Sequence, residues 1–455
     1  MERDEQQFHH KRKEIFKSLV RLAFNNQLKE RIDHILPYFA ENQAEVALVK
    51  AEILTALGLN PGNRFDTELA RAVDAALNLK EIEEPLLTIN RRICKECEET
   101  KCPVRCLHHQ SEGLMIEDNR CTACGKCLSL CPRGAISDKI QFIPLVKYLQ
   151  KEIPVYAHVA PAIVGQFGPG VSIGQLRSAL KSIGFTDLVE VALFADILTL
   201  READEYNKLV RTEDDFLITS CCCPVWINLL TRHYPELSQQ LTKTVSPMIA
   251  SGRVIKTIFP QAVTVFIGPC LAKKGEAKAP ELKGAIDYVL TFDELNQVFA
   301  ALELNLTQYP EDNKEQSSIG GRIYGKTGGV SAAVKMTVER INPDRELAFQ
   351  AVQADGVKEC RKLLNDLRDN KVKANFIEGM GCSGGCVGGP RRNIPVDQGS
   401  YQLIEYSRQA KAQNPIDNMN ITHILRYLTG VDRKKSQKID QLSFDRILLW
   451  EYERD

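Results

Sequence analysis

The sequence predicts a multidomain α/β protein with a helical N-terminal domain, a small cysteine-rich domain and a larger C-terminal α/β domain. The chain has 455 residues, whereas single hydrophobic cores stop growing at about 250–300 residues. Apolar residues recur at helical spacing before residue 90, and short β-branched segments alternate with helical stretches after residue 150. We therefore expect domains at residues 1–90, 91–148 and 149–432, followed by a tail at 433–455.

The N-terminal domain is predicted from apolar positions three or four residues apart. Ile15, Leu19 and Leu22 form one series, and Val49 and Ile53 belong to another. The pattern predicts a small all-helical domain. No function can be inferred from it.

The overall charge and the distribution of apolar residues exclude several function classes. Lysine plus arginine balances aspartate plus glutamate at 59 each, so no net field favours nucleic acid or an anionic membrane. The first residues are too charged for a signal peptide, and the most apolar run, at 188–200, contains Glu190 and Asp196. Fifteen cysteines in such a chain fit metal ligation in a reducing cytoplasm better than disulfides. We expect a cytoplasmic protein with no membrane and no nucleic-acid partner.

The second domain is predicted from a dense run of cysteines. Its second half, Cys121-x-x-Cys124-x-x-Cys127-x-x-x-Cys131-Pro, is the spacing of bacterial ferredoxins, in which the fourth cysteine of each run binds the other cluster. This rule predicts two [4Fe–4S] clusters, one held by Cys94, Cys97, Cys102 and Cys131, the other by Cys121, Cys124, Cys127 and Cys106. The first run has two extra residues before Cys102 and no proline after Cys106. Paired zinc sites are the alternative, but they favour C-x-x-C pairs set further apart.

The third domain is predicted from alternating strands and helices. The expected strands are 155–159, 188–193, 216–219, 263–267 and 285–290. Cysteine motifs follow two of them, after 216–219 and after 263–267. Because ligands bind outside the carboxyl ends of strands in open α/β sheets, these loops should meet at one crevice.

Three cysteine motifs in this domain supply separated thiolates. They read TSCCCPVW at 219–226, PCLAKKGE at 269–276 and FIEGMGCSGGCVGGP at 376–390. Glycines let the backbone approach a bulky ligand, and soft thiolates select zinc, copper or iron–sulfur clusters. Four separated thiolates are enough to hold a cluster.

One further motif is a false match. Residues 320–327, GGRIYGKT, fit the phosphate-binding P-loop pattern, but no strand-like segment precedes them. We therefore do not expect nucleotide binding there. Cys360 lies in a helical pattern without neighbouring cysteines and is expected to be a packing residue.

The three motifs in this order resemble the signatures of the [FeFe]-hydrogenase family, TSCCP-x-W, PC-x-x-K-x-x-E and F-x-E-x-M-x-C-x-GGC-x-x-GG. The extra cysteine in TSCCCP is similar to one subgroup of that family. The resemblance spans residues 90–430 and implies an α/β iron-hydrogenase catalytic domain with a ferredoxin-like domain that holds two further [4Fe–4S] clusters.

The resemblance also implies a cofactor, the H-cluster, and the residues around it. A [4Fe–4S] cubane would be held by Cys223, Cys270, Cys382 and Cys386. Cys386 would also bridge to a di-iron unit with CO, cyanide and azadithiolate, which requires hydrogenase maturation proteins. Lys273 would hydrogen-bond a cyanide, Glu276 would orient or pair that lysine, and Met380 would pack against the di-iron unit.

The family's proton route maps onto Glu205, Thr242, Glu202 and Cys222, in order from solvent to the active site. The triple cysteine leaves two registers open. Counting from Cys-Pro-x-Trp makes Cys223 the ligand and Cys222 the relay, whereas counting from Thr-Ser-Cys makes Cys222 the ligand and Cys221 the relay. We prefer the first, because the proline begins the next helix and fixes the direction of the ligand.

The chain departs from the family pattern beside the di-iron unit. Family members usually have methionine at Gly268, a small polar residue at Ala162 and glutamine at Met248. The resemblance places these three positions, with Pro161 and Pro269, in the wall around the cofactor.

The resemblance implies an enzyme that interconverts protons and electrons with H2 and exchanges electrons with ferredoxin or another soluble carrier. Two alternatives remain, a non-catalytic iron–sulfur scaffold or assembly protein and a hydrogen sensor. A scaffold has no use for a lysine that faces cyanide, and no signalling domain is apparent in the sequence.

Overall fold

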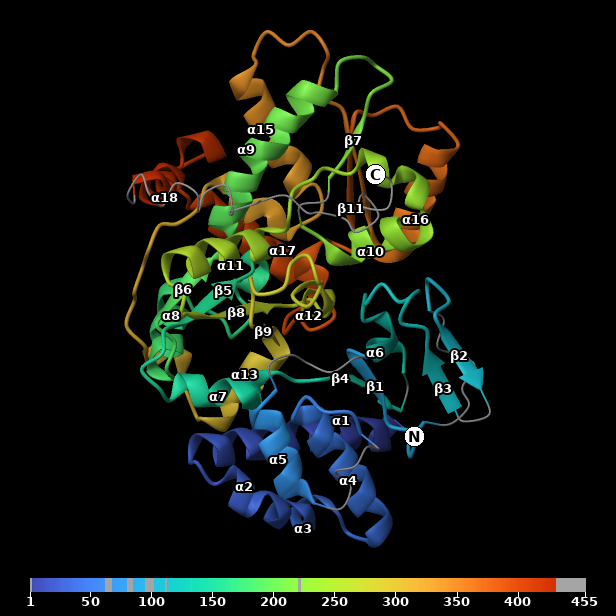
Figure 1. Ribbon diagram of the computed structural model, residues 1–455, viewed down its shortest axis with the longest axis vertical. Coiled ribbons are helices and arrows are strands. Elements are labelled where there is room, and N and C mark those ends of the chain that lie inside the picture. The colour runs from blue at the N-terminus through green and yellow to red at the C-terminus, as the bar shows by residue number, and fades with distance from the viewer. Residues whose placement is uncertain are drawn as a thin grey trace.

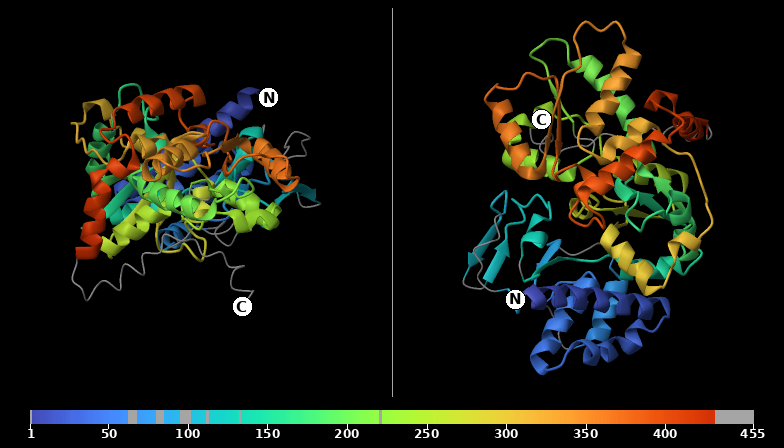
Figure 2. Two further views of the ribbon diagram at one scale, coloured as in Figure 1. Left: turned by 90° about the horizontal axis from the view of Figure 1, so that it is seen from above. Right: turned by 180° about the vertical axis from the view of Figure 1, so that it is seen from behind.

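The computed structural model describes residues 2–61, 68–79, 85–94, 102–110, 113–131, 133–219 and 222–430. Two cysteines of the sequence analysis, Cys97 and Cys221, and the predicted tail at 433–455 lie outside these ranges. In Figure 1 the N-terminal helices lie at the bottom, the cysteine-rich segment lies above them on the right, and the α/β part forms the rest. The view from behind shows the same arrangement (Figure 2).

The N-terminal segment is helical and contacts both other parts of the chain. Its helices are α1 (Glu2–Phe24), α2 (Leu28–Arg31), α3 (Leu36–Phe39), α4 (Gln43–Ala56) and α5 (Leu69–Leu77), with the 3-10 turn η1 (Ile32–Ile35). Ile15 and Leu19 of α1 are buried, as residues on one helical face should be. Arg12 donates to the carbonyl of Gly134 in the cysteine-rich segment at 2.9 Å, and Arg21 donates to the carbonyl of Ala301 in the α/β part at 3.0 Å.

The cysteine-rich segment contains two short antiparallel sheets. Its elements are β1 (Leu87–Ile89), β2 (Leu107–Gln110), β3 (Gly113–Ile116), α6 (Lys126–Leu130) and β4 (Ile136–Asp138). β2 pairs with β3, and β1 pairs with β4, with Ile89 opposite Ile136. The unit therefore includes a strand, β1, that lies before the predicted boundary at residue 90.

The first sheet of the α/β part is parallel, in the order β6-β5-β8-β9. Its strands are β5 (Val155–Val159), β6 (Asp187–Glu190), β8 (Val263–Gly268) and β9 (Tyr288–Thr291). The helices before and between them are α7 (Phe142–Leu149), α8 (Ile173–Ser182), α9 (Val191–Leu209), α10 (Pro224–His233), α11 (Pro247–Ile258) and α12 (Ala272–Glu276), with the 3-10 turns η2 (Pro161–Ile163) and η3 (Pro235–Gln240). Strand order reverses between β5 and β8, which is where open α/β sheets bind their ligands.

A second parallel sheet has the order β10-β11-β7. Its strands are β7 (Leu217–Ile218), β10 (Ala351–Asp355) and β11 (Phe376–Met380). The remaining elements are α13 (Phe292–Ala301), η4 (Leu306–Gln308), α14 (Ile319–Arg322), η5 (Ile323–Gly325), α15 (Gly329–Ile341), α16 (Gly356–Arg368), η6 (Cys386–Gly388), α17 (Val396–Arg408), η7 (Pro415–Asp417) and α18 (Met419–Gly430). The two sheets send the loops at their carboxyl ends toward one region.

The strand predicted at 188–193 is wrong in its second half. β6 ends at Glu190, and α9 begins at Val191 and is buried along most of its length. α9 packs against α11, α14, α15 and α18, so apolar residues cover all its faces and the helical period is hidden.

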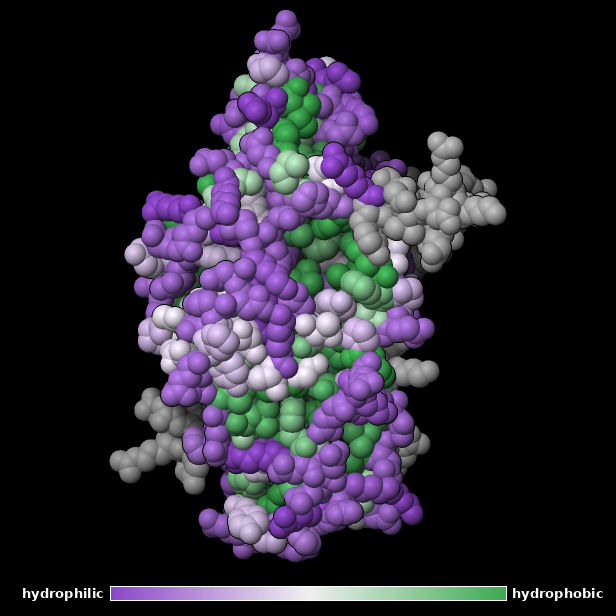
Figure 3. All heavy atoms as spheres, turned by 90° about the vertical axis from the view of Figure 1, so that its left-hand side faces the viewer, coloured by the Kyte–Doolittle hydropathy of each residue, from purple (hydrophilic) through white to green (hydrophobic). Residues whose placement is uncertain are grey.

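Among the described residues, none of the helices combines the length and apolar character that crossing a membrane requires. Apolar side chains do reach the surface on the face that lies on the left in Figure 1, where they gather in a hollow at mid-height (Figure 3). On α18, Met419 is 60% exposed and Leu425 44%.

Candidate functional site

The four predicted ligand thiols follow the carboxyl ends of three parallel strands. Cys223 is the residue before α10 and follows β7, Cys270 lies between β8 and α12, and Cys382 and Cys386 follow β11. Pro224 occupies the first position of α10, which suits proline because that position needs no backbone N–H. The loops belong to different sheets, so only the tertiary structure brings the thiols together.

The shifts in the pKa values of these thiols indicate that they lie within electrostatic range of one another inside the protein. Burial raises the pKa of Cys270 to about 12, and the nearby Cys223 adds to the rise. Burial likewise raises the pKa of Cys386 to about 12, followed by the effects of Cys223 and Cys270. Burial also raises the pKa of Cys382 well above the ordinary value, with further contributions from Cys270, Cys223 and Cys386. Four convergent sulfurs of this kind would lose their protons only to a strong positive partner.

The donor set fits an iron–sulfur cluster. Cys270, Cys382 and Cys386 keep some accessible surface although burial dominates their pKa values, so they border a space inside the molecule. The backbone N–H of Gly381 donates to the sulfur of Cys223 at 3.2 Å, a contact that stabilises a thiolate ligand. All four donors are soft sulfurs, the type that iron–sulfur clusters use.

Lys273 places a buried ammonium at this cluster of thiols. It is 6% exposed, and its Nζ lies 2.7 Å from Oε2 of Glu276, which also accepts from the hydroxyl of Ser246 at 3.0 Å. Burial lowers the pKa of Lys273, but the charge of Glu276 and its hydrogen bond outweigh burial, and the pKa is raised overall. The positive charge of Lys273 in turn favours the thiolate forms of Cys270 and Cys386.

Cys222 and Met380 are neighbours at the ends of β7 and β11. The thiol of Cys222 donates to the sulfur of Met380 at 3.5 Å, and Met380 is 1% exposed. Trp226 donates its indole N–H to the carbonyl of Thr219 at 3.0 Å and so holds the start of the cysteine loop against α10.

Glu202 of α9 is a buried acceptor for three hydroxyl groups. Thr242 donates to its Oε1 at 2.7 Å, Thr219 at 2.9 Å and Thr244 at 3.1 Å. The structure thus joins Glu202 and Thr242 directly, while Glu205 lies almost one turn further along α9 and is half-buried. Sequence reasoning missed Thr219 and Thr244. Thr219 opens the TSCCCPVW motif and links Glu202 to the chain that carries Cys222.

At the positions that depart from the family pattern, neighbouring residues of this chain pack closely and leave little free space. A Cβ added at Gly268 would lie 2.6 Å from Cε1 of Phe266, so the Phe266 ring takes the space beside this glycine. Met248 and Ala162 are fully buried, and Pro161 begins η2 after β5. Pro269 packs against Gly389, where an added Cβ would lie 2.7 Å from the Cβ of Pro269. The Cys270 and Cys386 loops are therefore in direct contact.

Most of the described thiols of the cysteine-rich segment lie around one small cavity. Five of them line one small cavity, namely Cys102, Cys106, Cys121, Cys124 and Cys127. The sulfurs of Cys102 and Cys106 are 3.4 Å apart, because the chain turns back at Arg105, which has a φ of 55°. Cys131 packs with Cys94 and Cys127 in an apolar cluster beside this cavity, so Cys127 belongs to both groups. Cys102 was expected with Cys94 and Cys131, but the structure places it beside Cys106, and the division into two ligand sets stays a prediction.

The segment touches the active-site loops through Gly125. A Cβ added there would lie 2.7 Å from Leu271 Cδ1 and 2.8 Å from Pro390 Cγ, and its φ of 70° is one that glycine adopts readily. Leu271 follows Cys270, and Pro390 closes the Cys386 loop. The charge of Cys124 is close enough to contribute to the raised pKa of Cys382, after the effects of burial and of the nearer thiols.

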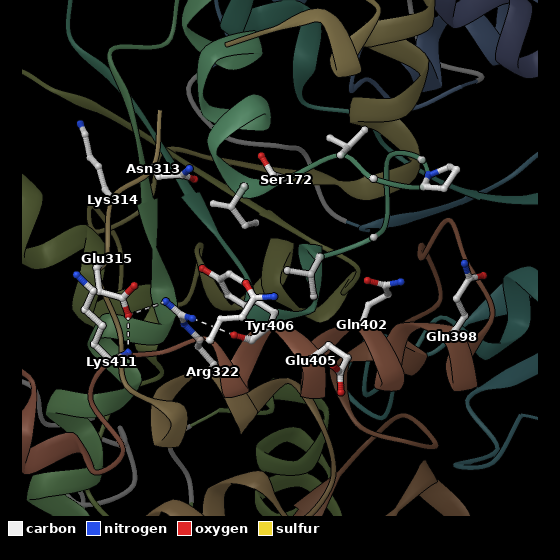
Figure 4. Close-up of a pocket in the computed structure, with 18 residues that line it drawn as sticks. Ser172, Asn313, Lys314, Glu315, Arg322, Gln398, Gln402, Glu405, Tyr406 and Lys411 are labelled. Atoms are coloured by element: carbon white, nitrogen blue, oxygen red, sulfur yellow. Dashed lines mark hydrogen bonds and ion pairs between the residues drawn. The ribbon is translucent and has the colours of Figure 1, made fainter. Parts of the chain in front are cut away.

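The cavity in Figure 4 is separate from these thiols. Its volume is about 640 Å³, and it lies between α17, the loop 164–173 and residues 313–315. The predicted site residues do not line the described part of its wall. Arg322 is held there by the carbonyl of Tyr406 at 2.9 Å and by Glu315 at 3.1 Å. Residues 310–318 before the P-loop match form no strand, so that match lacks the structure of a phosphate site.

Comparison with known families identifies the larger domain. The model for the iron only hydrogenase large subunit, C-terminal domain, matches residues 153–390, just over half of the chain. The chain belongs to the iron-only hydrogenase family. A model for a 4Fe–4S binding domain matches residues 114–137 of this hydrogenase-family chain, which contain Cys121, Cys124, Cys127 and Cys131.

Relatives of two kinds align with this iron-only hydrogenase chain. The NADP-reducing hydrogenase subunit HndD of Solidesulfovibrio fructosivorans is 26% identical over 65% of the chain, and the alignment covers 59% of that protein. The periplasmic [Fe] hydrogenase large subunit of Nitratidesulfovibrio vulgaris is 29% identical over 64% of the chain and 88% of that protein. Cytosolic iron-sulfur assembly component 3 of Mus musculus is 21% identical over 58% of the chain and 67% of that protein. The chain thus spans less than two thirds of the length of the HndD subunit.

The fold is shared with solved hydrogenases. A single-residue variant of the [FeFe]-hydrogenase HydA1 from Chlamydomonas reinhardtii superposes with a TM-score of 0.53 at 20% identity, covering 62% of this chain and 93% of that one. This similarity establishes the α/β iron-hydrogenase fold.

Proposed function

We propose that this chain is an [FeFe]-hydrogenase that catalyses the reversible reaction of two protons and two electrons to H2. The buried Lys273–Glu276 pair is the observation that carries the proposal. Glu276 compensates the buried ammonium of Lys273, so the lysine stays charged beside the four thiols, and its remaining N–H groups can donate to an anionic ligand there. The cyanide of an H-cluster is such a ligand.

In this proposal Cys223, Cys270, Cys382 and Cys386 hold the cubane of the H-cluster, and Met380 forms the wall beside the di-iron unit. The di-iron unit supplies the redox chemistry on hydrogen when it is bound. The chain supplies thiolate ligands, a dry space and a positive charge at Lys273.

The chain also supplies a proton route. Glu202 accepts hydrogen bonds from Thr242 and from Thr219, which lies three residues before Cys222. A carboxylate and a thiol can each take up and release a proton near neutral pH with modest tuning, and a threonine hydroxyl can pass a proton on because it donates one hydrogen bond and accepts another. We therefore assign Glu205 and Thr242 to the outer part of the route, Glu202 to its buried centre and Cys222 to its end.

Electrons would travel through the two clusters of the cysteine-rich segment, which approaches the active-site loops at Gly125. Ferredoxin or another soluble carrier is the proposed partner, the hydrogenase maturation proteins would install the di-iron unit, and the cytoplasm is the proposed location. The triple cysteine places the chain in the TSCCCP subgroup under this proposal.

An iron–sulfur scaffold is the second candidate, because one relative is named as an iron–sulfur assembly component. A scaffold would hold cubanes and need neither the Lys273 charge nor a buried carboxylate near Cys222.

Hydrogen isotope exchange separates the two candidates. The full chain is produced with hydrogenase maturation proteins, and formation of HD and H2 from D2 in water is followed by mass spectrometry. The proposal predicts exchange that disappears in Lys273→Ala. A protein with full cubane content and no exchange would instead be a scaffold.

A further inference from the structure

A second buried lysine, Lys274, lies next to Lys273 but points into a different environment. It is 1% exposed, and its Nζ contacts Oδ2 of Asp138 at 2.8 Å, Oε1 of Glu294 at 2.5 Å and the carbonyl of Lys139 at 2.6 Å. The other oxygen of Asp138 accepts from Nε of Arg391 at 3.0 Å and also contacts a terminal nitrogen of that guanidinium. Asp138 is thus clamped between two cations.

The members of this cluster come from three functionally distinct places. Asp138 ends β4 of the cysteine-rich segment. Lys274 lies on α12, four residues after Cys270, and Arg391 lies five residues after Cys386. The Cys270 loop and the Cys386 loop, which follow strands of two different sheets, are therefore both bound to one carboxylate of the cysteine-rich segment. In Figure 1, β4 lies below α12 and to the right of α13.

The pKa values of Asp138 and Lys274 are shifted toward their ionised forms. Burial favours the neutral form of Asp138, but Arg391 and Lys274 outweigh it and hold its pKa below the ordinary value. Burial opposes the charge on Lys274 as well, yet Asp138 and Glu294 raise its pKa overall. Glu294 is fixed in turn, because it forms a capping box with Thr291 at the start of α13. Ion pairs without access to water are a poor source of stability but can specify a unique geometry.

The geometry that they specify is the approach of the two cluster-bearing regions. Gly125, next to Cys124, fits between Leu271 and Pro390 without space for a side chain. Leu271 lies three residues before Lys274, and Pro390 lies directly before Arg391. A shift of β4 against either loop would open this contact. Because electron tunnelling falls off exponentially with distance, such a shift would slow transfer even if every cluster stayed bound.

We propose that Asp138, together with Lys274 and Arg391, is a positioning site that fixes the spacing between the cluster beside Cys124 and the active-site cubane. The inference rests on the proposed function only in requiring the two cubanes, and it does not require the di-iron unit. Among the described residues, none of the hydrogen bonds of Asp138, Lys274 and Arg391 reaches a predicted ligand sulfur, so this site acts through the loops that it joins.

The test compares Asp138→Asn with Asp196→Asn in the full chain, made without maturation proteins so that only cubanes are present. Asp196 is a matched control, since it is also fully buried and accepts from Ser318 and Asn418, but it lies on α9 away from this contact. Electron paramagnetic resonance of the fully reduced protein reports the magnetic coupling between cubanes, and iron analysis reports their content.

We expect coupling in the wild type and in Asp196→Asn, and weaker coupling in Asp138→Asn at unchanged iron content, with at least tenfold slower reduction of the active-site cubane. Unchanged coupling and rate in an Asp138→Asn protein that retains its iron would overturn the inference, as would a wild type without coupling. If Asp138→Asn does not fold, Asp138→Glu decides, because it keeps the charge and adds one methylene. Reduced coupling in that variant supports the positioning role, and wild-type coupling overturns it. Failure of the proposed function would show separately, as a lack of isotope exchange after maturation.

Discussion

Replacing Glu202 by glutamine tests whether the buried hydroxyl cluster is a proton route. The carboxylate accepts hydrogen bonds from Thr242, Thr219 and Thr244 at 2.7–3.1 Å. Glu202 is fully buried. Glutamine has the same shape and keeps one oxygen acceptor, and the threonine hydroxyls can rotate to accept from its NH2 group. The change therefore removes proton transfer while leaving most hydrogen bonds possible.

The expected effects differ greatly in size. One weakened hydrogen bond costs about 0.5–1.5 kcal/mol of stability. Loss of a positioned acid–base group costs about 10²–10⁴-fold in rate, equivalent to roughly 3–5 kcal/mol on the barrier. Hydrogen evolution from reduced methyl viologen should thus fall at least about a hundredfold, while the thermal midpoint and the cluster spectra stay close to those of the wild type.

Asp204→Asn is the matched control, because Asp204 lies on the same helix, is exposed and pairs with Lys208 at 2.6 Å. It should retain wild-type turnover. Turnover of Glu202→Gln within threefold of wild type, at equal cluster content, would refute the route, because a buried carboxyl group that can be neutralised without loss cannot carry the protons.

Three further changes address the clusters and one the fold. Cys382→Ala should abolish the spectroscopic signal of the active-site cubane, and retention of that signal would contradict the ligand set. Cys222→Ala should keep the matured cluster but lose about 10²–10⁴-fold in turnover, whereas loss of the cluster itself would move the ligand back by one residue. Cys124→Ala should slow ferredoxin-linked turnover while isotope exchange persists, and unchanged turnover would contradict the electron route. Burial lowers the pKa of His158 to about 3, so the folded protein excludes a proton that the unfolded chain takes up below its pKa of about 6.5. The free energy of unfolding of the wild type should therefore fall as the pH is lowered from 6.5 to 3, by up to about 1.4 kcal/mol per pH unit more than that of His158→Gln. Urea midpoints that fall in parallel with pH in the two proteins would contradict this.

The sequence predicted the α/β fold because strand and helix periods are local signals. β5 has the predicted bounds, 155–159, and β8 is one residue longer than predicted. The run at 188–193 misled because a helix buried on all sides shows no period. The pairing of β1 with β4 joins residues almost fifty positions apart and leaves no local trace in three-residue strands.

The parts of the candidate site that form contiguous sequence motifs could be predicted from the sequence. The parts that depend on tertiary packing could not. The cysteine motifs and the three-residue spacing of Lys273 and Glu276 are readable in the sequence. The hydroxyls of Thr219 and Thr244 around Glu202 are not, because threonine is common and only the tertiary structure brings these two to one carboxylate. Asp138 carries no motif at all, and its role emerges from two cations that lie more than 130 residues away in the sequence. The proximity of Cys102 to Cys106 depends on a positive φ at Arg105, which the cysteine spacing does not reveal.

Infrared spectroscopy of the protein produced with maturation proteins tests the central claim most directly, namely that the four thiols and Lys273 form the site of an H-cluster. Metal-bound CO and cyanide absorb in a region that is free of protein bands. The account predicts both sets of bands, with the cyanide bands shifted in Lys273→Arg and absent together with the CO bands in Cys386→Ala. A protein that carries its full complement of cubanes and shows neither CO nor cyanide bands would contradict the account and identify an iron–sulfur scaffold.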